Sequence, residues 1–244
     1  MPARNYNDFH KNLKVQYKPI KENNFTYRVM LNIIFSYLNQ NSKKSLKILD
    51  YGCGVGTVDF FLAKNGYKVH GIDVSPTAIN LCKKSVEVMK LKNINFSTNI
   101  KNIGKNRYDM VICSEVIEHV KDDRKVLLSV LSALKKDGYL ILSTPSLNAP
   151  LFKLGLANGF DKRVGHLRRY TEKDLIEKVE RAGFKIVKII KTEGIIRNSL
   201  FLFPILGNLV RFIKGPISDI VTFVDGISLK LFGESDICVI CQRP

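Results

Sequence analysis

The chain has 244 residues, 45% of them hydrophobic, and its 39 basic and 22 acidic side chains give a formal net charge of +17. This length and apolar content suffice to bury a core, and we favour one domain with insertions over two small domains. The charge favours phosphates, acidic lipid headgroups or anionic substrates as partners. Because Lys and Arg are scattered from Arg4 to Arg243, a general basic background is an equal alternative to a functional basic face. Met1 to Lys21 is polar, which argues against a secretory signal or transit peptide and predicts a cytoplasmic protein.

The five cysteines are an odd set of the kind expected for reduced thiols in a cytosolic protein: Cys53, Cys82, Cys113, Cys238 and Cys241. Cys238 and Cys241 have the spacing of a CxxC motif. They lie in a strand-like run, however, where residues three apart point to opposite faces. A redox or zinc role for this pair is therefore disfavoured.

In chain order, apolar runs with strand character alternate with segments of helical spacing. Helices are predicted at 25–38, 58–64, 75–90 and 122–136, and strands at 46–50, 67–72, 95–97, 109–113 and 139–143. Ser75 is a typical N-cap, with Pro76 at the first helical position. The alternation predicts an α/β domain with a parallel sheet.

After residue 143 the pattern becomes less regular. Residues 144–164 show no clean period among several Pro and Gly, so 144–170 is predicted to be a loop on the substrate side. A helix capped by Thr171 is predicted to Ala182, followed by strands at 184–191 and 237–241.

An apolar insertion, residues 194–233, separates those last two strands. Its longest uncharged run, Asn198 to Val210, is broken by Pro204 and Gly207 and is too short to span a bilayer. Its second half has the spacing of a helix with one apolar face, formed by Ile217, Ile220, Val221, Val224, Ile227 and Leu231. The insertion resembles an amphipathic element that lies on a membrane, and a cap over the active site or a dimer contact is the alternative.

The run Asp50-Tyr51-Gly52-Cys53-Gly54-Val55-Gly56 turns from a strand into a helix. Its glycines let a ligand approach the backbone and expose the amides at the helix N-terminus. A dinucleotide fingerprint would need its third glycine at Thr57, which disfavours a nicotinamide cofactor. Asp73 ends the next strand, where a carboxylate can accept hydrogen bonds from both ribose hydroxyls of an adenosine.

Together, the run Ile48-Leu49-Asp50-Tyr51-Gly52-Cys53-Gly54-Val55-Gly56 and the run Gly71-Ile72-Asp73 resemble the class I S-adenosylmethionine-dependent methyltransferases of type 11/12. The resemblance covers residues 25 to 193 and the final strand. It implies a Rossmann-like, doubly wound, seven-stranded sheet that is mostly parallel, with an antiparallel last strand and an apolar helical insertion before it. A single methyltransferase domain over 1–244 would then carry an N-terminal helical extension, residues 1–45.

The resemblance also implies S-adenosylmethionine as the cofactor. The glycine turn would hold the methionine part with Asp50 near its amino group, and Asp73 would take the ribose. At the adenine pocket Asn99 replaces the usual acid and would hold the adenine amine less firmly. The expected cofactor-binding residues are Asp50, Tyr51, Gly52, Cys53, Gly54, Gly56, Asp73, Val74, Asn99, Ile100, Ser114 and Glu115.

The strand 109–113 leads into Glu115-Val116-Ile117-Glu118-His119 at the edge where open α/β sheets bind ligands. If this segment is helical, Glu115, Glu118 and His119 share one side. The E-x-x-E-H pattern resembles that of quinone-biosynthesis O-methyltransferases and small-RNA 3′-end 2′-O-methyltransferases, in which such residues and a downstream histidine hold a divalent metal. The resemblance implies Glu115, Glu118, His119 and His166 as metal ligands, and the metal would lower the pKa of a substrate hydroxyl.

Without a metal, His119 or His166 is the candidate general base. The alternative for Glu118 and His119 is a solvated helix face or a structural pair, and for His166 a capping or packing role. Three neighbouring guanidinium groups could clamp an anionic substrate or form a solvated basic turn, and they belong to Arg163, Arg168 and Arg169.

We therefore predict an S-adenosylmethionine-dependent methyltransferase acting on a hydroxyl of a small or lipid-linked acceptor, either quinone-like or glycan-like. It would be cytoplasmic or bound peripherally to a membrane through 194–233. RNA 2′-O-methylation is the second choice, because no RNA-binding module is recognisable. The third is a catalytically silent binding protein that retains the fold.

Overall fold

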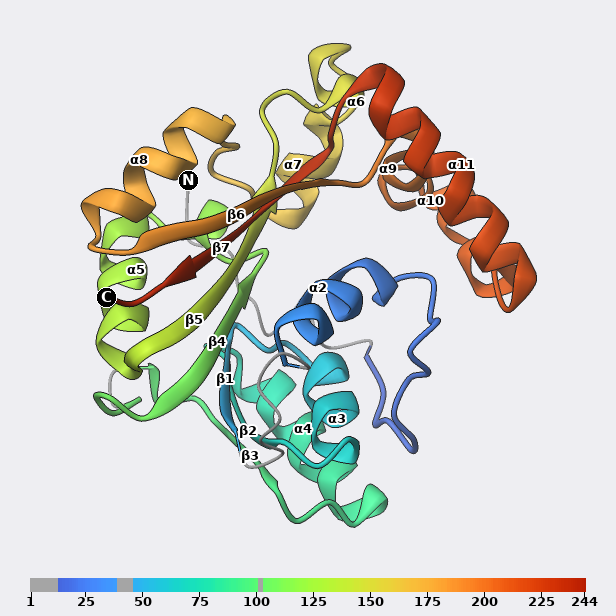
Figure 1. Cartoon of the computed structure of the whole chain (residues 1–244). Helices are drawn as coiled ribbons and strands as arrows, with labels where there is room; N and C mark the ends of the chain where they lie inside the picture. Colours follow the sequence, from blue (N-terminus) through green and yellow to red (C-terminus); the bar gives the residue numbers. More distant parts are fainter. Residues whose placement is uncertain (1–12, 39–45, 101–102) are drawn as a thin grey trace.

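The computed structural model describes residues 13–38, 46–100 and 103–244, and within them the strands form one seven-stranded sheet (Figure 1). The sheet order is β3-β2-β1-β4-β5-β7-β6. Its strands are β1 (Lys47–Tyr51), β2 (Lys68–Ile72), β3 (Ile94–Ser97), β4 (Tyr108–Ser114), β5 (Leu134–Pro145), β6 (Lys185–Thr192) and β7 (Asp236–Gln242). The first five pair in parallel, whereas β7 is antiparallel to β5 and β6. The predicted doubly wound sheet with an antiparallel last strand is confirmed.

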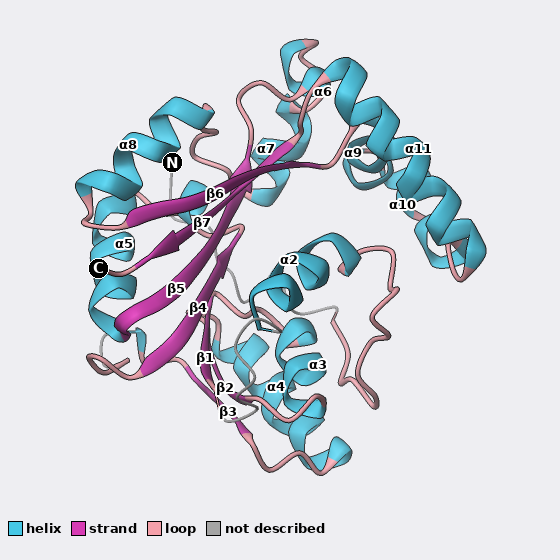
Figure 2. Ribbon diagram, in the orientation of Figure 1, coloured by secondary structure: helices cyan, strands magenta, loops and turns pink. Residues whose placement is uncertain are grey.

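Helices cover both faces of the sheet (Figure 2). They are α2 (Arg28–Leu38), α3 (Thr57–Lys64), α4 (Pro76–Met89), α5 (Asp123–Ala133), α6 (Pro150–Lys153), α7 (Asn158–Val164), α8 (Glu172–Arg181), α9 (Ile195–Leu202), α10 (Pro204–Gly207) and α11 (Pro216–Phe232), with short 3₁₀ turns η2 (Ile117–His119) and η3 (Val210–Phe212). Apolar residues of α5 and α8 pack on one face of the sheet, and those of α2, α3 and α4 pack on the other. The sheet is therefore buried on both sides, as parallel sheets require.

The two cysteines of the CxxC motif lie on opposite faces of β7. Cys238 packs in the core beneath α2 and α3, and Cys241 packs in the core beneath α5 and α8. Burial raises the pKa of both thiols, that of Cys241 to about 12. The two thiols are thus buried, protonated and directed to opposite faces of the sheet, as the strand spacing predicted.

Local capping signals were correct. The Ser75 hydroxyl accepts a hydrogen bond from the Ala78 amide at 3.2 Å, and Pro76 begins α4. Thr171 and Asp174 form a complete capping box at the start of α8. These caps satisfy amides that a helix leaves unpaired at its first turn.

Two predicted boundaries differ from the structure. The helix predicted over 122–136 ends at Ala133, because Leu134 pairs with Tyr108 and begins β5, a strand of twelve residues that ends at Pro145. Asp137 adopts a left-handed φ of 62° inside this long strand. The loop predicted over 144–170 contains α6 and α7, helices of four and seven residues that are too short to show a period.

The N-terminal extension predicted over 1–45 includes residues 1–12 and 39–45, which lie outside the described residues. In the described part, α2 confirms the helix predicted to end at Leu38. The insertion 194–233 forms α9, α10, η3 and α11. Among the described residues no single helix has the length and apolar content to cross a bilayer. One pair of helical segments has the required length and apolar content only when its two parts are counted together: Ile195–Leu202 and Pro204–Phe212, with a bend of 98° between them.

Candidate active site

A pocket of about 950 Å³ opens at the carboxyl ends of β1 and β4. Most of the predicted site residues line it: Asp50, Tyr51, Gly52, Cys53, Gly54, Asp73, Val74, Ile100, Ser114, Glu115, His119 and His166. The glycine turn and Asp73 lie in the same pocket as the two histidines. A molecule that fills the pocket can therefore reach both groups of residues.

The backbone conformation of the glycine turn requires glycine at three positions. Gly52, Gly54 and Gly56 all have left-handed φ values, of 88°, 53° and 74°. At Gly52 a Cβ would lie 2.4 Å from a methyl group of Val116, so this glycine is also required for packing. Gly56 is not one of the residues that line the pocket, and a Cβ at this position would lie 2.8 Å from the Phe96 ring.

Asp73 is buried beside the turn and fixed by two backbone amides. The Gly54 amide donates to its Oδ2 at 2.9 Å, and the Ser75 amide donates to its Oδ1 at 2.8 Å. A carboxylate offers about four lone-pair sites, so each oxygen can accept one more hydrogen bond. The carboxylate can thus serve a pair of vicinal hydroxyl groups, as the predicted ribose contact requires.

Asp50 is buried at the end of β1 together with Asp59 of α3. The two carboxyl groups lie within hydrogen-bonding reach of each other, and among the described residues neither oxygen of Asp59 has another hydrogen-bond partner. Burial raises the pKa of Asp50 to about 6 and, with the repulsion from Asp50, raises the pKa of Asp59 well above its usual range. The pair therefore carries a strong preference for a nearby cation, such as an ammonium group.

Asn99 and Ile100 occupy different environments. Ile100 lines the pocket, whereas Asn99 is exposed and does not. The amide of Asn99 donates to the Ser97 hydroxyl at 3.3 Å, which holds this turn after β3. The adenine role of Asn99 stays a prediction, and Ile100 is the apolar neighbour that the structure places at the pocket.

Glu115 does not continue into a helix with Glu118 and His119. Its φ is +56°, and only residues 117–119 form a 3₁₀ turn, so the three side chains do not share one helix face. The Glu115 carboxylate accepts a hydrogen bond from the Ser143 hydroxyl at 2.9 Å and faces the pocket, through which solvent reaches it. The protein around its carboxyl group removes enough water to raise its pKa to about 7.

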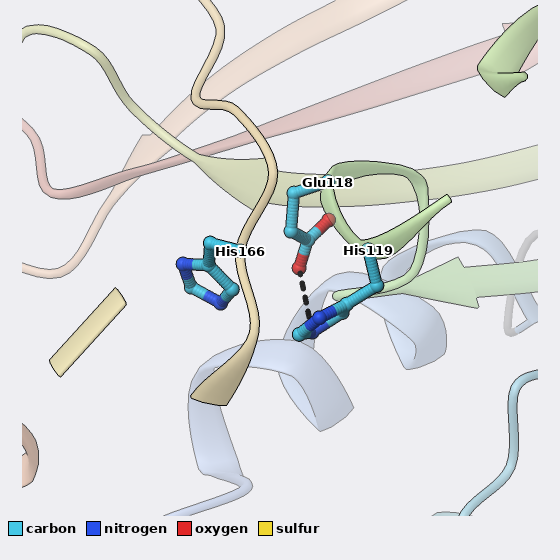
Figure 3. A group of neighbouring side chains, drawn as sticks. All are labelled: Glu118, His119 and His166. Carbon is cyan, nitrogen blue, oxygen red and sulfur yellow. Dashed lines mark ion pairs between the residues drawn. The ribbon is translucent and has the colours of Figure 1, made fainter. Parts of the chain in front are cut away.

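Glu118, His119 and His166 are brought together instead (Figure 3). One ligand atom from each lies within 4.8 Å of the others, and the two imidazole rings are 4.8 Å apart between centroids. Glu118 is fully buried, so a solvated helix face is the wrong interpretation for it. Its Oε2 accepts from the Thr144 hydroxyl at 3.0 Å, while Oε1 has no hydrogen-bond partner within the described part of the chain and lies 3.7 Å from His119 Nε2.

His166 is oriented by a carboxylate and an arginine. Its Nδ1 donates to Asp161 at 3.0 Å, and Arg169 forms a bidentate pair with the same carboxylate, with both contacts at 2.7 Å. Burial opposes ionisation of Asp161, but the hydrogen bonds from His166 and Arg169 outweigh it and lower its pKa to about 2. The ionised Asp161 fixes the His166 tautomer in which Nε2 is the proton acceptor.

The arginines considered as a clamp therefore differ from one another. Arg169 is committed to Asp161, and Arg168 donates to Asp123 at 3.1 Å. Arg163 lies over the Phe160 ring at 5.4 Å. Two of the three guanidinium groups thus bind internal carboxylates and organise the loop.

Two acids at the pocket were not among the predicted site residues. Glu193 follows β6 and Asp236 begins β7, and both line the pocket near Glu115. Burial, followed by repulsion from Glu115, raises the pKa of Asp236 well above its usual range. The position of Asp236 at the start of the last strand was the signal from which its place at the pocket could have been predicted. The first residue of an antiparallel strand lies at the carboxyl ends of its parallel neighbours.

The segment before α2 was also missed. Leu13, Thr26 and Tyr27 line the pocket. Gln16 fixes this segment to the glycine turn, since its side-chain amide donates to the Val55 carbonyl and to the Thr57 hydroxyl at 3.0 Å each. The N-terminal segment therefore forms one wall of the pocket.

The methyltransferase domain family matches this chain over residues 25–189. The chain is 34% identical over 116 residues to a ubiquinone biosynthesis O-methyltransferase of Coxiella burnetii, a match that covers 46% of this chain and 49% of that protein. The chain thus matches about half the length of such relatives.

Among solved structures, the magnesium protoporphyrin IX methyltransferase of Synechocystis PCC 6803 is similar, with a TM-score of 0.62, 18% identity, and coverage of 98% of this chain and 93% of that one. The [4+2]-cyclase SpnF has the same TM-score at 15% identity, with coverage of 98% and 92%. Because these two share a fold under different names, the likeness shows the fold alone. The match over residues 25–189 covers more than half of the sequence, and the chain belongs to the methyltransferase domain family.

Proposed function

We propose that this protein transfers a methyl group from S-adenosylmethionine to a hydroxyl of a small or lipid-linked acceptor. The observation that carries the proposal is one pocket with the glycine turn, Asp50 and Asp73 among its walls and with His119 and His166 lining it too. The names of relatives such as the ubiquinone biosynthesis O-methyltransferase of Coxiella burnetii support an oxygen acceptor.

The residues present fit the cofactor. The buried Asp50 and Asp59 pair lacks a basic partner among the described ion pairs and suits the ammonium group of the methionine part. Asp73 keeps acceptor capacity for two ribose hydroxyls. When bound, the cofactor supplies a methyl group on a cationic sulfur, which leaves as a neutral thioether without help from an acid.

The protein must then remove a proton from the acceptor, and His166 is the base that the geometry favours. Asp161 holds its Nδ1 proton, so Nε2 can accept the hydroxyl proton as the acceptor oxygen forms its bond to the methyl carbon. The resulting imidazolium is stabilised by the ionised Asp161. Arg169 keeps that carboxylate in place.

The same side chains fit a divalent metal. Glu118 offers a buried carboxylate oxygen that no hydrogen-bond donor among the described residues contacts, next to two imidazoles, which is a donor set that Mn²⁺ or Zn²⁺ accepts. Such an ion would lower the pKa of the acceptor hydroxyl in place of the base. Glu115 does not belong to this group among the described residues, and its predicted role as a ligand rests on the resemblance alone.

The test is methyl transfer from labelled S-adenosylmethionine to quinol, glycan, lipid and RNA fractions, with and without a chelator. We expect an acceptor with a free hydroxyl, activity that survives the chelator, and a loss of about 10²- to 10⁴-fold in kcat for His166→Asn. His70→Asn is the matched control, because His70 lies on β2 against Tyr108 and does not line the pocket.

If a chelator abolished activity and added metal restored it, a metal ion and not His166 would activate the acceptor hydroxyl. Methylation of RNA would favour the second candidate function. A protein that binds no S-adenosylmethionine by calorimetry would overturn the proposal and leave a binding protein with this fold.

A further inference from the structure

Helix α11 has its polar side toward the protein and its apolar side toward the outside. Its buried residues are Ser218, Asp225 and Ser228, none of which is apolar. Six apolar residues on the outer side of the helix are 41% to 70% exposed, and we call them the apolar face: Ile217, Ile220, Phe223, Val224, Ile227 and Leu231. An ordinary surface helix has the opposite arrangement.

The orientation of α11 is fixed by polar contacts on its inner side. Asp225 accepts hydrogen bonds from the amides of Gly194 and Arg197, at 2.9 and 2.8 Å, and so caps α9. Arg28 donates to the Ser218 hydroxyl at 3.0 Å. Any side chain at Gly194 would collide with α11, since its Cβ would lie 2.5 Å from the Asp225 carbonyl. The helix cannot rotate its apolar face inward without losing these bonds.

Helix α11 lies at the periphery of the molecule and extends beyond the end of β6 (Figure 1). Exposed apolar residues also occur in the preceding segment, with Ile205 83% and Phe212 62% exposed. Monomeric soluble proteins rarely expose a continuous apolar stripe of this length, so the face is expected to contact a partner. A cap over the active site, one of the predicted alternatives for the insertion, would have buried the side chains of the apolar face.

The charges around the apolar face match an anionic surface. Arg211, Lys214 and Lys230 are exposed, whereas Asp219 is paired with Arg28 at 2.8 Å and Asp225 is buried. The insertion thus presents free positive charge and no unpaired acid. A second copy of the chain would carry the same overall net charge of +17, which opposes self-association, whereas an anionic bilayer attracts a chain of this charge.

We propose that the apolar face of α11 docks onto a bilayer containing anionic lipids, with the helix lying in the interface. Ile220, Phe223 and Ile227 enter the acyl boundary, and the basic side chains contact the headgroups. Asn198 and Phe201 of α9, the helix on which α11 packs, line the pocket. On the basis of the proposed function, this docking presents the pocket to acceptors carried by the membrane.

The experiment is co-sedimentation of the full chain with vesicles of phosphatidylcholine, alone or mixed with phosphatidylglycerol. We expect binding to the mixed vesicles that weakens in high salt, because salt screens the headgroup attraction. The triple variant I220E, F223E, I227E should bind at least about tenfold more weakly. The matched control V88E, L128E, V187E changes side chains that are 40% to 47% exposed on other elements and should bind like the unaltered chain.

A second variant, K214Q with K230Q, leaves the apolar face intact and should lose most of the preference for phosphatidylglycerol, so the proposal does not depend on the triple variant alone. Equal binding by the triple variant and the unaltered chain would overturn the proposal, as would no binding to either vesicle. A dimer by light scattering that the triple variant converts to monomer would assign the face to self-association instead. Vesicle binding without methyl transfer would refute only the proposed function.

Discussion

Replacing Asp59 by Asn tests the unusual carboxyl pair beneath the glycine turn. Asp50 and Asp59 are both buried, and among the described residues no ion pair neutralises either of them. Asn has the shape of Asp, cannot ionise, and can donate a hydrogen bond to Asp50. We therefore expect the variant to be more stable than the unaltered protein at alkaline pH in the absence of cofactor.

The magnitude follows from the pKa of Asp50, which burial raises from 3.8 to about 6. The folded chain thus keeps protons that the unfolded chain releases, and the free energy of unfolding falls as the pH rises through this window. A difference of about two pH units corresponds to about 3 kcal/mol for Asp50. The pKa of Asp59 is raised as well, and Asp59→Asn removes the loss of stability that follows from it, so the variant should be more stable than the unaltered protein at pH 8 and equally stable near pH 4.

The assay is urea denaturation from pH 4 to 8.5, with Asp137→Asn as the control at an exposed position. The unaltered protein and the control should lose stability in parallel across this range, and Asp59→Asn should lose less. A variant that is destabilised by the same amount at every pH would refute the reasoning, because the carboxyl pair would then act through packing and not through its charge.

Three further changes have expected outcomes in urea denaturation. Gly56→Ala should destabilise the protein by roughly 1–3 kcal/mol more than Gly66→Ala. Both residues have a left-handed φ, but only at Gly56 would a Cβ collide with a neighbour, at 2.8 Å from Phe96. Equal losses of stability would show that backbone strain alone matters. Asp225→Ala removes the cap of α9 and should cost about 1–3 kcal/mol while speeding limited proteolysis of the insertion, and an unchanged cleavage pattern would count against that role. Tyr170→Phe deletes a buried hydroxyl that donates to the Asp123 carboxylate at 2.8 Å, and it should lower the free energy of unfolding by about 1–3 kcal/mol. A change outside this range would contradict the role of that hydrogen bond.

The parts of the site that were predictable depend on short stretches of chain. Glycines at a strand-to-helix turn indicate positive φ values, and an acid at the end of the next strand must lie at the same sheet edge. The positions of Gly52, Gly54 and Asp73 follow from these local rules. The approach of Glu193 and Asp236 does not follow from such local rules, since it also requires that β7 pair between β5 and β6.

Residue spacing also misled at one position. The E-x-x-E-H pattern fits a helix, and a spacing pattern contains no information on the φ of Glu115, which turns the chain the other way. In α11 the spacing correctly indicated an amphipathic helix. It could not indicate which side faces the protein, because that choice is made by Asp225 and Ser218 through contacts with distant segments.

The burial of β7 on both faces has a consequence for how its alignment is specified. Its five central residues, Ile237 to Cys241, are all apolar and all fully buried, so sliding the strand by one position would exchange one apolar set for another. Such a slip would meet little hydrophobic resistance. The correct alignment must be imposed by the polar ends, where the Ser235 amide bonds the Glu193 carbonyl at 2.8 Å and the Arg243 amide bonds the Gly138 carbonyl at 2.9 Å. In this strand the core provides the stability, and the two ends select the pairing.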